Sequence, residues 1–366
     1  MDRLRQLEEC GQAVWVDYIQ RDFIVNGELG RLMREDGVTG VTSNPTIFEK
    51  AINESPHYDD GFRKLLEADP HMDAVTVYDK LSVEDIRMAA DVLRPAYDRT
   101  QGSDGFVSIE VSPYLSGDTE GSIAEARRLW REVSRPNLMV KIPATREGIP
   151  AIEACLSEGI NINITLMFSL AHYKAVAEAF LRAVTRCPHP ETLSSVASVF
   201  ISRIDTMIDP LLQAIGTPEA LALQGKIAIA NAKVIYQEFR NIFHGERFSN
   251  LRNRGAHVQR VLWGSTGTKN PAYSDVLYVE ELIGPETINT MPLKTLSAFR
   301  DHGQVRGATI QDGLEAARMD LAKLKDLGID LGAITEKLQQ EGLAAFTQSF
   351  DKLLAGVEKK CHAAYA

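Results

Sequence analysis

A single lysine interrupts an otherwise apolar run, LMVKIPAT, at residues 138–145. The run predicts a buried strand, and an ammonium ion is costly to bury. A fold that keeps Lys141 there must either pair it with an acid or hold it uncharged as a nucleophile. A neutral amine adds to a ketone and forms a Schiff base, so Lys141 is a candidate for covalent carbonyl chemistry. The alternative is an ordinary ion-pair or surface lysine.

Polar side chains also occur at or near the ends of other apolar segments. They are Asp17, Asn44, Glu110, Asn163, Thr165 and Ser198, with Phe200 two residues beyond the last. Three have structural alternatives: Asp17 could cap a helix, Asn44 could be a turn residue before a proline, and Asn163 could satisfy backbone groups. Glu110 is harder to explain in that way, because a carboxylate between two apolar residues needs a partner or a proton. One amine, two carboxylates and two amides together favour carbonyl chemistry.

These residue types suit the cleavage of a carbon–carbon bond beside a ketone. Lys141 would form an iminium ion, which withdraws electrons from the adjacent bond. Asp17 would take a hydroxyl proton during cleavage. Glu110, through a water that Thr165 could hold, would supply the acid for carbinolamine dehydration. The amides Asn44 and Asn163 would hold the hydroxyl groups of a polyol without adding charge.

Eight short apolar runs alternate with helical patterns and must position these side chains. The expected strands are residues 13–17, 40–45, 106–111, 138–145, 159–166, 195–201, 260–264 and 287–291. This alternation predicts an α/β fold, a closed parallel (β/α)8 TIM barrel, in which chemistry collects at the C-terminal ends of the strands. An open doubly wound sheet is the second possibility. No GxGxxG turn follows an early strand, so no dinucleotide site is indicated.

The sequence also contains helical segments beyond the eight strand–helix units of the barrel. One covers residues 27–36, a longer stretch runs from about 58 to 99, and residues 311–366 contain two amphipathic helices, at 314–327 and 343–357. The two C-terminal helices are expected to pack outside the barrel or to cover one end. We therefore expect residues 1–366 to form a single barrel domain with extra helices at about 58–99 and 311–366.

Composition narrows the possible partners. The formal net charge of -10 argues against a nucleic-acid or acidic-membrane partner, because these need clustered positive charge. The four cysteines are widely spaced without a CxxC pair, so we expect neither a disulfide framework nor a metal site. The N-terminus has no apolar signal region, and no apolar stretch approaches membrane-spanning length. These features predict a cytoplasmic globular protein.

Two segments in this order resemble the transaldolase family, and in particular its longer subgroup of Schiff-base enzymes of the class I aldolase type. TSNPTIF at residues 42–48 is similar to the family's threonine-any-asparagine-proline signature, and VKIPAT at 140–145 is similar to its active-site lysine strand. The likeness extends from the WVD segment at 15–17 to the TMP segment at 290–292. It implies a barrel enzyme of the non-oxidative pentose phosphate pathway.

The resemblance also implies roles for individual residues. Lys141 would be the Schiff-base lysine, Asp17 the acid/base of bond cleavage, and Glu110 the partner of a catalytic water. Contacts to the dihydroxyacetone unit and that water would come from Asn44, Asn163, Thr165 and Ser198. The reaction implied is reversible transfer of dihydroxyacetone from sedoheptulose 7-phosphate or fructose 6-phosphate to glyceraldehyde 3-phosphate or erythrose 4-phosphate, without a metal or other cofactor.

The phosphate site implied by the resemblance contains one departure. Arg203 matches a phosphate-binding arginine, whereas the stretch that holds Ser265 and Lys269 has no second arginine where many members carry one. Lys269 would supply a point charge in place of a two-pronged donor. The alternatives are that Arg203 pairs with Asp205 or Asp209 on its own helix and that Lys269 is simply solvated.

The same residues are compatible with other functions. Related aldolases that use free dihydroxyacetone resemble one another in a tyrosine at the position of Phe200, and an apolar ring there favours retention of the intermediate. The remaining candidates are a transaldolase-like enzyme of specialised metabolism with another acceptor and a non-catalytic barrel that binds a ligand. Dimers are frequent among relatives, so a homodimer is expected.

Overall fold

Eight parallel strands close into a barrel in the computed structural model, which describes residues 3–363. The strands pair in chain order, and β8 pairs with β1. They are β1 (Gln12–Asp17), β2 (Val38–Thr42), β3 (Val107–Glu110), β4 (Leu138–Pro143), β5 (Ile162–Met167), β6 (Ser195–Phe200), β7 (Arg260–Gly264) and β8 (Thr287–Met291). The closed ring confirms the predicted (β/α)8 barrel over the open sheet, and all eight expected strands are present.

The barrel interior has a small apolar core of its own, because successive side chains on a strand point to opposite faces. This inner core consists of Trp15, Phe106, Met139, Val196, Leu262 and Ile288. Their strand neighbours, such as Val14, Val16 and Val140, belong to the larger core between sheet and helices. Two residues after Trp15 and after Met139, the same face of the strand reaches the C-terminal part of the barrel. Asp17 and Lys141 occupy such positions.

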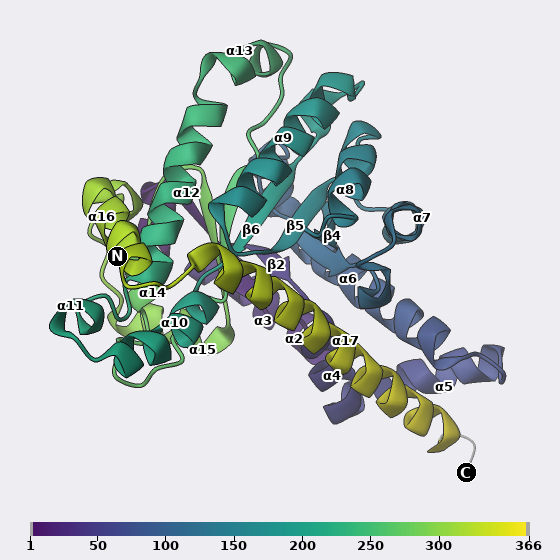
Figure 1. Ribbon diagram of the computed structural model, residues 1–366. Coiled ribbons are helices and arrows are strands. Elements are labelled where there is room, and N and C mark those ends of the chain that lie inside the picture. The colour runs from purple at the N-terminus through teal and green to yellow at the C-terminus, as the bar shows by residue number, and fades with distance from the viewer. Residues whose placement is uncertain (1–2, 364–366) are drawn as a thin grey trace.

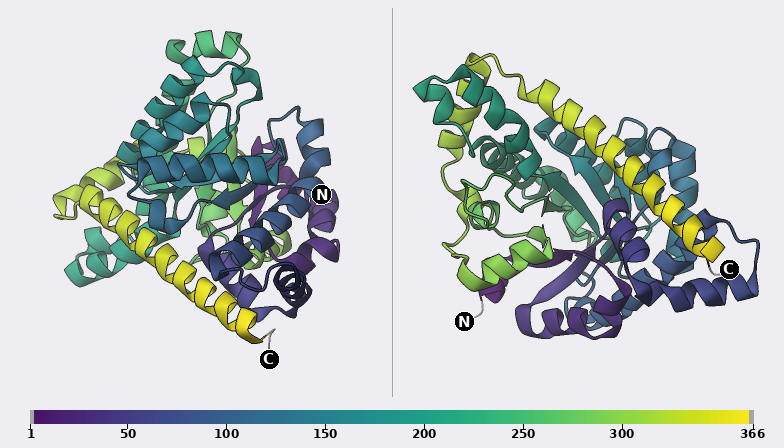
Figure 2. Two further views of the ribbon diagram at one scale, coloured as in Figure 1. Left: turned by 90° about the vertical axis from the view of Figure 1, so that its right-hand side faces the viewer. Right: turned by 90° about the horizontal axis from the view of Figure 1, so that it is seen from below.

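Helices surround the sheet and connect its strands (Figures 1 and 2). Before β6 they are α1 (Arg3–Glu9), α2 (Arg21–Val25), α3 (Glu28–Arg31), α4 (Pro45–Glu54), α5 (Asp59–Ala68), α6 (Ala74–Arg99), α7 (Thr119–Val133), α8 (Gly148–Ser157) and α9 (Leu170–Arg186). After β6 they are α10 (Ser202–Ile215), α11 (Pro218–Leu221), α12 (Ile227–Phe243), α13 (Glu246–Asn253), α14 (Leu277–Glu281), α15 (Leu293–His302), α16 (Leu314–Asp326) and α17 (Leu331–Ala363).

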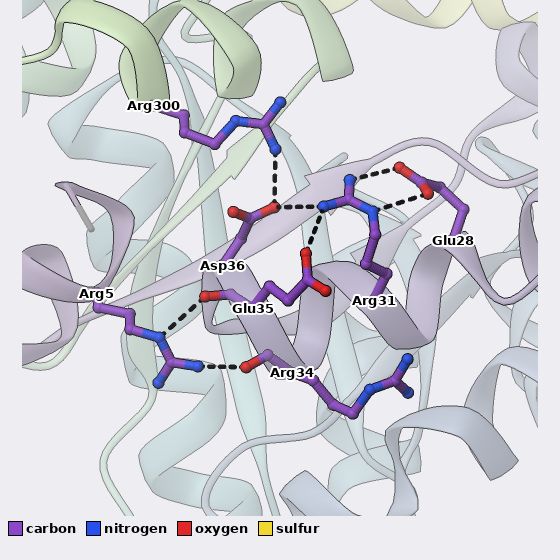
Figure 3. Close-up of polar contacts among 7 residues, drawn as sticks. All are labelled: Arg5, Glu28, Arg31, Arg34, Glu35, Asp36 and Arg300. Carbon is purple, nitrogen blue, oxygen red and sulfur yellow. Dashed lines mark hydrogen bonds and ion pairs between the residues drawn. The ribbon is translucent and has the colours of Figure 1, made fainter. Parts of the chain in front are cut away.

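The helix expected at residues 27–36 is partly of another type. After α3 the chain continues as a π-helix, η1 (Leu32–Asp36). Figure 3 shows the ion pairs around it, which join Arg31 to Glu28, Glu35 and Asp36, and Arg300 to Asp36. Arg5 donates to the carbonyl oxygens of Arg34 and Glu35. These contacts therefore join the π-helix η1 to α1 and α15.

The additional helical regions occupy the predicted places. Residues 58–99 contain α5 and α6, and residues 314–327 correspond to α16. The last helix is longer than expected: α17 has 33 residues and begins before residue 343. It runs along one side of the molecule as one long helix (Figures 1 and 2) and contacts α4, α6, α10 and β5. It thereby covers part of the C-terminal end of the barrel. Residues 1–2 and 364–366 of the predicted domain lie outside the described range.

Candidate active site

A cavity of about 140 Å³ opens at the C-terminal end of the barrel. Ten predicted site residues line it: Asp17, Asn44, Lys141, Asn163, Thr165, Ser198, Phe200, Arg203, Ser265 and Lys269. They come from β1, β4, β5 and β6, from the segments that follow β2 and β7, and, for Arg203, from the first turn of α10. Of the predicted site residues, only Glu110 does not line this cavity.

Lys141 is buried, with 5% of its surface exposed. Its Nζ donates to the carbonyl oxygen of Ser43 at 2.8 Å and lies 3.2 Å from Oε2 of Glu110. The strand register explains this pair, since Glu110 lies beside Lys141 and Lys141 beside Asn163 on three adjacent strands. A solvated surface lysine is therefore excluded. The amine is held at a defined position, with a carboxylate within reach.

Glu110 lines a different, neighbouring cavity of about 270 Å³ together with Ser43 and Asn44. Burial raises the pKa of Glu110, the positive charge of Lys141 opposes that rise, and the negative charge of Asp17 adds to it. Among the described residues Oε2 of Glu110 has no partner other than Lys141, and Oγ1 of Thr165 has none. A carboxyl group and a hydroxyl on the strands flanking β4 thus keep hydrogen-bonding capacity.

Asp17 stands at the end of a chain of hydroxyl groups. Oγ1 of Thr42 donates to Oδ1 of Asp17 at 2.6 Å, and Oγ1 of Thr290 lies 2.6 Å from Oγ1 of Thr42. Burial raises the pKa of Asp17, whereas the charge of Lys141 and the hydrogen bond from Thr42 lower it. The helix that follows, α2, has Gln20 at its N-cap position. The capping alternative for Asp17 was therefore wrong.

The two predicted amides are held in different ways. Asn163 donates to Oγ of Ser108 at 3.0 Å and accepts from Oγ of Ser198 at 2.7 Å, so it bonds to side chains and not to stray backbone groups. Asn44 caps α4, because its Oδ1 accepts from the backbone NH of Ile47 at 3.0 Å. The alternative of a plain turn residue was thus wrong, because Asn44 is the N-cap of a helix and also lines the cavity. Among the described residues the amide NH₂ group of Asn44 forms no hydrogen bond, so it could bind a ligand.

The other end of the cavity is positively charged. Arg203 forms no ion pair within residues 3–363, and its guanidinium lies 5.6 Å from the centre of the Phe200 ring. Burial lowers the pKa of Arg203, and the charge of Glu341 opposes this shift. Lys269 is exposed and has no ion-pair partner in the same described range. Oγ of Ser265 lies 3.0 Å from Oγ of Ser202. The arrangement suits an anionic group.

Neither aspartate on the helix of Arg203 pairs with it. Asp205 accepts from the backbone NH of Ala228 and from the hydroxyl of Tyr278, both at 2.8 Å. Asp209 accepts from the hydroxyl of Tyr273 at 2.6 Å. Burial without a nearby cation raises the pKa of Asp205 to about 7. The proposed pairing of Arg203 with these aspartates was therefore wrong.

Several residues that shape the site were not predicted. Thr42 and Thr290 contact or support Asp17, Ser108 holds Asn163, and Phe346 of α17 lines the cavity. The strand alternation contains a signal for Thr290, which follows the inner-core residue Ile288 by two positions. For Phe346 no such signal exists, because it lies on a helix outside the eight repeated units.

No group of three or more His, Cys, Asp or Glu side chains is arranged to bind a metal ion within the described part of the chain. In residues 3–363 no helix combines the length and apolar character needed to cross a membrane. The four cysteines are free thiols.

A closed α/β barrel with a buried lysine beside a carboxylate at the C-terminal ends of its strands defines the class, a lysine-containing barrel with the layout of a Schiff-base enzyme. Within this class the chain belongs to the transaldolase/fructose-6-phosphate aldolase family, whose model matches residues 14–357.

Similar proteins extend over nearly the whole chain. A protein named transaldolase from Thermobifida fusca is 46% identical over 98% of this chain and 98% of its own length. The transaldolase of Thiobacillus denitrificans is also 46% identical, over 98% of this chain and 100% of its own. The transaldolase of a Parafrankia species is 47% identical over 98% and 97% of the two chains.

Proposed function

We propose that the protein is a transaldolase, a transferase of the non-oxidative pentose phosphate pathway. It moves a dihydroxyacetone unit reversibly from sedoheptulose 7-phosphate or fructose 6-phosphate to an aldose phosphate, glyceraldehyde 3-phosphate or erythrose 4-phosphate. Full-length similarity to proteins named transaldolase supports this function. The observation that carries the mechanism is Nζ of Lys141, buried at the cavity wall 3.2 Å from Glu110.

The first step joins the ketose to Lys141. The neutral amine attacks the ketone carbon, and the carbonyl oxygen becomes the hydroxyl of a carbinolamine. Glu110 donates a proton through a water that also bonds to Thr165, so the hydroxyl leaves as water and an iminium ion remains. The unpartnered Oγ1 of Thr165 supports this role, because a buried hydroxyl without a partner is costly.

The second step breaks the carbon–carbon bond. Asp17, as a carboxylate, takes the proton of the hydroxyl two carbons from the iminium carbon, and the aldose phosphate leaves as an aldehyde. The bonding electrons move into the iminium group and form an enamine. Attack of this enamine on an acceptor aldehyde reverses the sequence. Asn44, Asn163 and Ser198 hold the hydroxyl groups, and Phe200 covers the intermediate.

The phosphate of each substrate binds at the positively charged end of the cavity. Arg203 supplies a guanidinium without a competing ion pair among the described residues, which favours charge-assisted hydrogen bonds to phosphate oxygens. Ser265 adds a hydroxyl. Lys269 contributes a point charge from an exposed position, so we assign it the weaker contact.

Borohydride trapping tests this proposal. Borohydride reduction in the presence of fructose 6-phosphate should leave a covalent adduct on Lys141, located by peptide mass spectrometry. Lys233 offers a matched control: it is also buried, at 9% exposure, but its Nζ donates to the carbonyl of Asp312 at 2.9 Å. Lys141→Met should abolish the adduct and Lys233→Met should keep it. Absence of an adduct in the unmodified enzyme would overturn the proposal.

A fructose 6-phosphate aldolase that releases free dihydroxyacetone is the second candidate. Phe200 argues against it, since the ring offers no hydroxyl to deliver water to the bound intermediate; its edge meets Phe168, with ring centres 5.4 Å apart. Release of dihydroxyacetone without an acceptor, at a rate that matches transfer, would favour this aldolase. Acceptor profiling would separate both from a transaldolase-like enzyme of specialised metabolism.

Three further expectations remain proposals. We propose that residues 1–366 act as one catalytic domain, that the protein is cytoplasmic, and that it forms a homodimer. Light scattering coupled to gel filtration tests the homodimer, and cell fractionation tests the location.

A further inference from the structure

Strand β5 contains an irregularity beside the site. Its pairing with β6 shifts between Ile164 and Met167, so that three steps along β5 match two along β6. Within this bulge Leu166 has φ 57°, in the left-handed region that non-glycine residues rarely adopt. A bulge re-aims neighbouring side chains. The residue directly before Leu166 is Thr165, whose hydroxyl has no partner among the described residues.

A glutamine from the C-terminal helix holds this bulge. Nε2 of Gln339, on α17, donates to the carbonyl oxygen of Leu166 at 3.0 Å and to that of Ala144 at 3.1 Å. Only the NH₂ end of the amide can donate twice, so its orientation is fixed by its partners. The backbone NH of Ala144 in turn donates to the carbonyl oxygen of Thr165 at 2.9 Å. Gln339 therefore joins the C-terminal ends of β4 and β5. Its contact with β4, at Ala144, lies three residues after Lys141.

The helix also approaches the bulge closely at Gly342, one turn after Gln339. A Cβ atom added at Gly342 would lie 2.8 Å from Cδ2 of Leu166, closer than carbon atoms can pack. Phe346, one further turn along the same helix, lines the cavity. One face of α17 thus fixes the backbone of Leu166, packs on its side chain and closes part of the site.

We propose that Gln339 is a positioning residue for Schiff-base formation. By bonding to Leu166 and Ala144, it holds Leu166 in its left-handed conformation and so fixes the direction of the Thr165 hydroxyl toward the water used in carbinolamine dehydration. The inference rests on the proposed function, since it assigns the contacts of α17 with β4 and β5 a role in carbinolamine dehydration. A merely structural glutamine would attach α17 to the barrel without affecting the rate of imine formation.

Substitution of Gln339 tests the inference, with its neighbour as control. Gln339→Glu keeps the shape but replaces the two donors by oxygen, and Gln339→Leu removes all polarity. Gln340 is exposed on the same helix, so Gln340→Glu and Gln340→Leu are matched controls. We expect the Gln339 variants to form the borohydride-trapped adduct roughly 10- to 100-fold more slowly, with KM for fructose 6-phosphate nearly unchanged. The Gln340 variants should match the unmodified enzyme.

A double-mutant cycle separates positioning from general loss of structure. If Gln339 acts through Thr165, then Gln339→Leu should slow adduct formation far less in a Thr165→Val background than alone. In addition, Leu166→Gly should restore part of the rate to Gln339→Leu, because glycine adopts positive φ freely, while the loss of a buried leucine lowers thermal stability further. Rate and stability would then change in opposite directions.

The outcomes are distinguishable. Unmodified enzyme that forms no adduct overturns the proposed function itself. Unmodified enzyme that forms it, with Gln339→Glu and Gln339→Leu equally fast or with additive effects in the cycle, overturns the positioning role alone. Circular dichroism checks the fold of each variant. Should Gln339→Leu fail to fold, Gln339→Asn, whose amide is too short to span both carbonyls, replaces it in the cycle and in the Leu166→Gly test.

Discussion

Removal of the hydroxyl of Thr42 should shift the pH dependence of the reaction. Thr42 donates to Oδ1 of Asp17 at 2.6 Å, and this bond lowers the pKa of Asp17 against the opposing effect of burial. Thr42→Val keeps the shape of the side chain and deletes the donor. The pKa of Asp17 should therefore rise, because its charged form loses a stabilising hydrogen bond.

The size of this shift follows from the strength of the bond. A hydrogen bond to a charged group contributes roughly 1.5–3 kcal/mol, and one pKa unit corresponds to about 1.36 kcal/mol, so the expected rise is about 1–2 units. Asp17 acts as a carboxylate base in the proposed mechanism. The acid limb of kcat/KM should therefore move to higher pH by the same amount, with little loss of activity well above it.

Steady-state assays with fructose 6-phosphate and erythrose 4-phosphate across the pH range measure this limb. Thr42→Ser retains the hydroxyl and should follow the unmodified enzyme. Thr290→Val removes only the second hydroxyl of the chain, 2.6 Å from Thr42, and should shift the limb less and in the same direction. An acid limb in Thr42→Val that coincides with that of the unmodified enzyme would refute the assignment of Asp17 as the base.

Four other substitutions probe the phosphate end of the cavity and the stability of the barrel. Arg203→Ala should raise KM for phosphorylated substrates roughly 10- to 100-fold. Lys269→Ala should raise it by about 5-fold or less, because Lys269 is exposed. Equal effects on unphosphorylated acceptors would argue against phosphate contacts. The pKa of Asp205 is raised to about 7 from 3.8, so its protonated form is favoured in the folded state and the fold loses stability as pH rises between these values. Asp205→Asn should therefore raise the free energy of unfolding in urea little near pH 4 but by up to roughly 4 kcal/mol at pH 8, and equal gains at both pH values would contradict this explanation. Gly40→Ala would bring a Cβ within 2.3 Å of the Trp15 ring, and a loss of about 1–3 kcal/mol is expected by thermal unfolding; unchanged stability would show that the ring can move.

The position of the main site residues could be predicted because one local rule generates them. On an inward-facing strand position an apolar residue fills the barrel, and two residues later the same face reaches the open end. Trp15 and Asp17 obey this rule, as do Met139 and Lys141. Parallel pairing then brings the ends of neighbouring strands together, so the side chains converge without any knowledge of the loops.

Contacts between distant elements could not be predicted in the same way. The amphipathic pattern of α17 shows which face is apolar, but it does not identify the partner of that face, and so Gln339 and Phe346 were not expected at the site. The same limit applies to Arg203. Its helix offers two aspartates, and only the packing of other elements shows that Tyr278 and Tyr273 bond to them instead.

Lys141, Glu110 and Asp17 affect one another's protonation. The charge of Lys141 lowers the pKa of both Glu110 and Asp17, against burial that raises them. In the proposed mechanism Lys141 reacts as a neutral amine, and without its positive charge the pKa of each carboxyl group rises. Glu110, 3.2 Å from Nζ, is the carboxyl group that can take up the proton of Lys141 directly. In the proposed mechanism carbinolamine dehydration consumes one proton, so transfer of the Lys141 proton to Glu110 would both create the nucleophile and protonate the acid that completes the Schiff base.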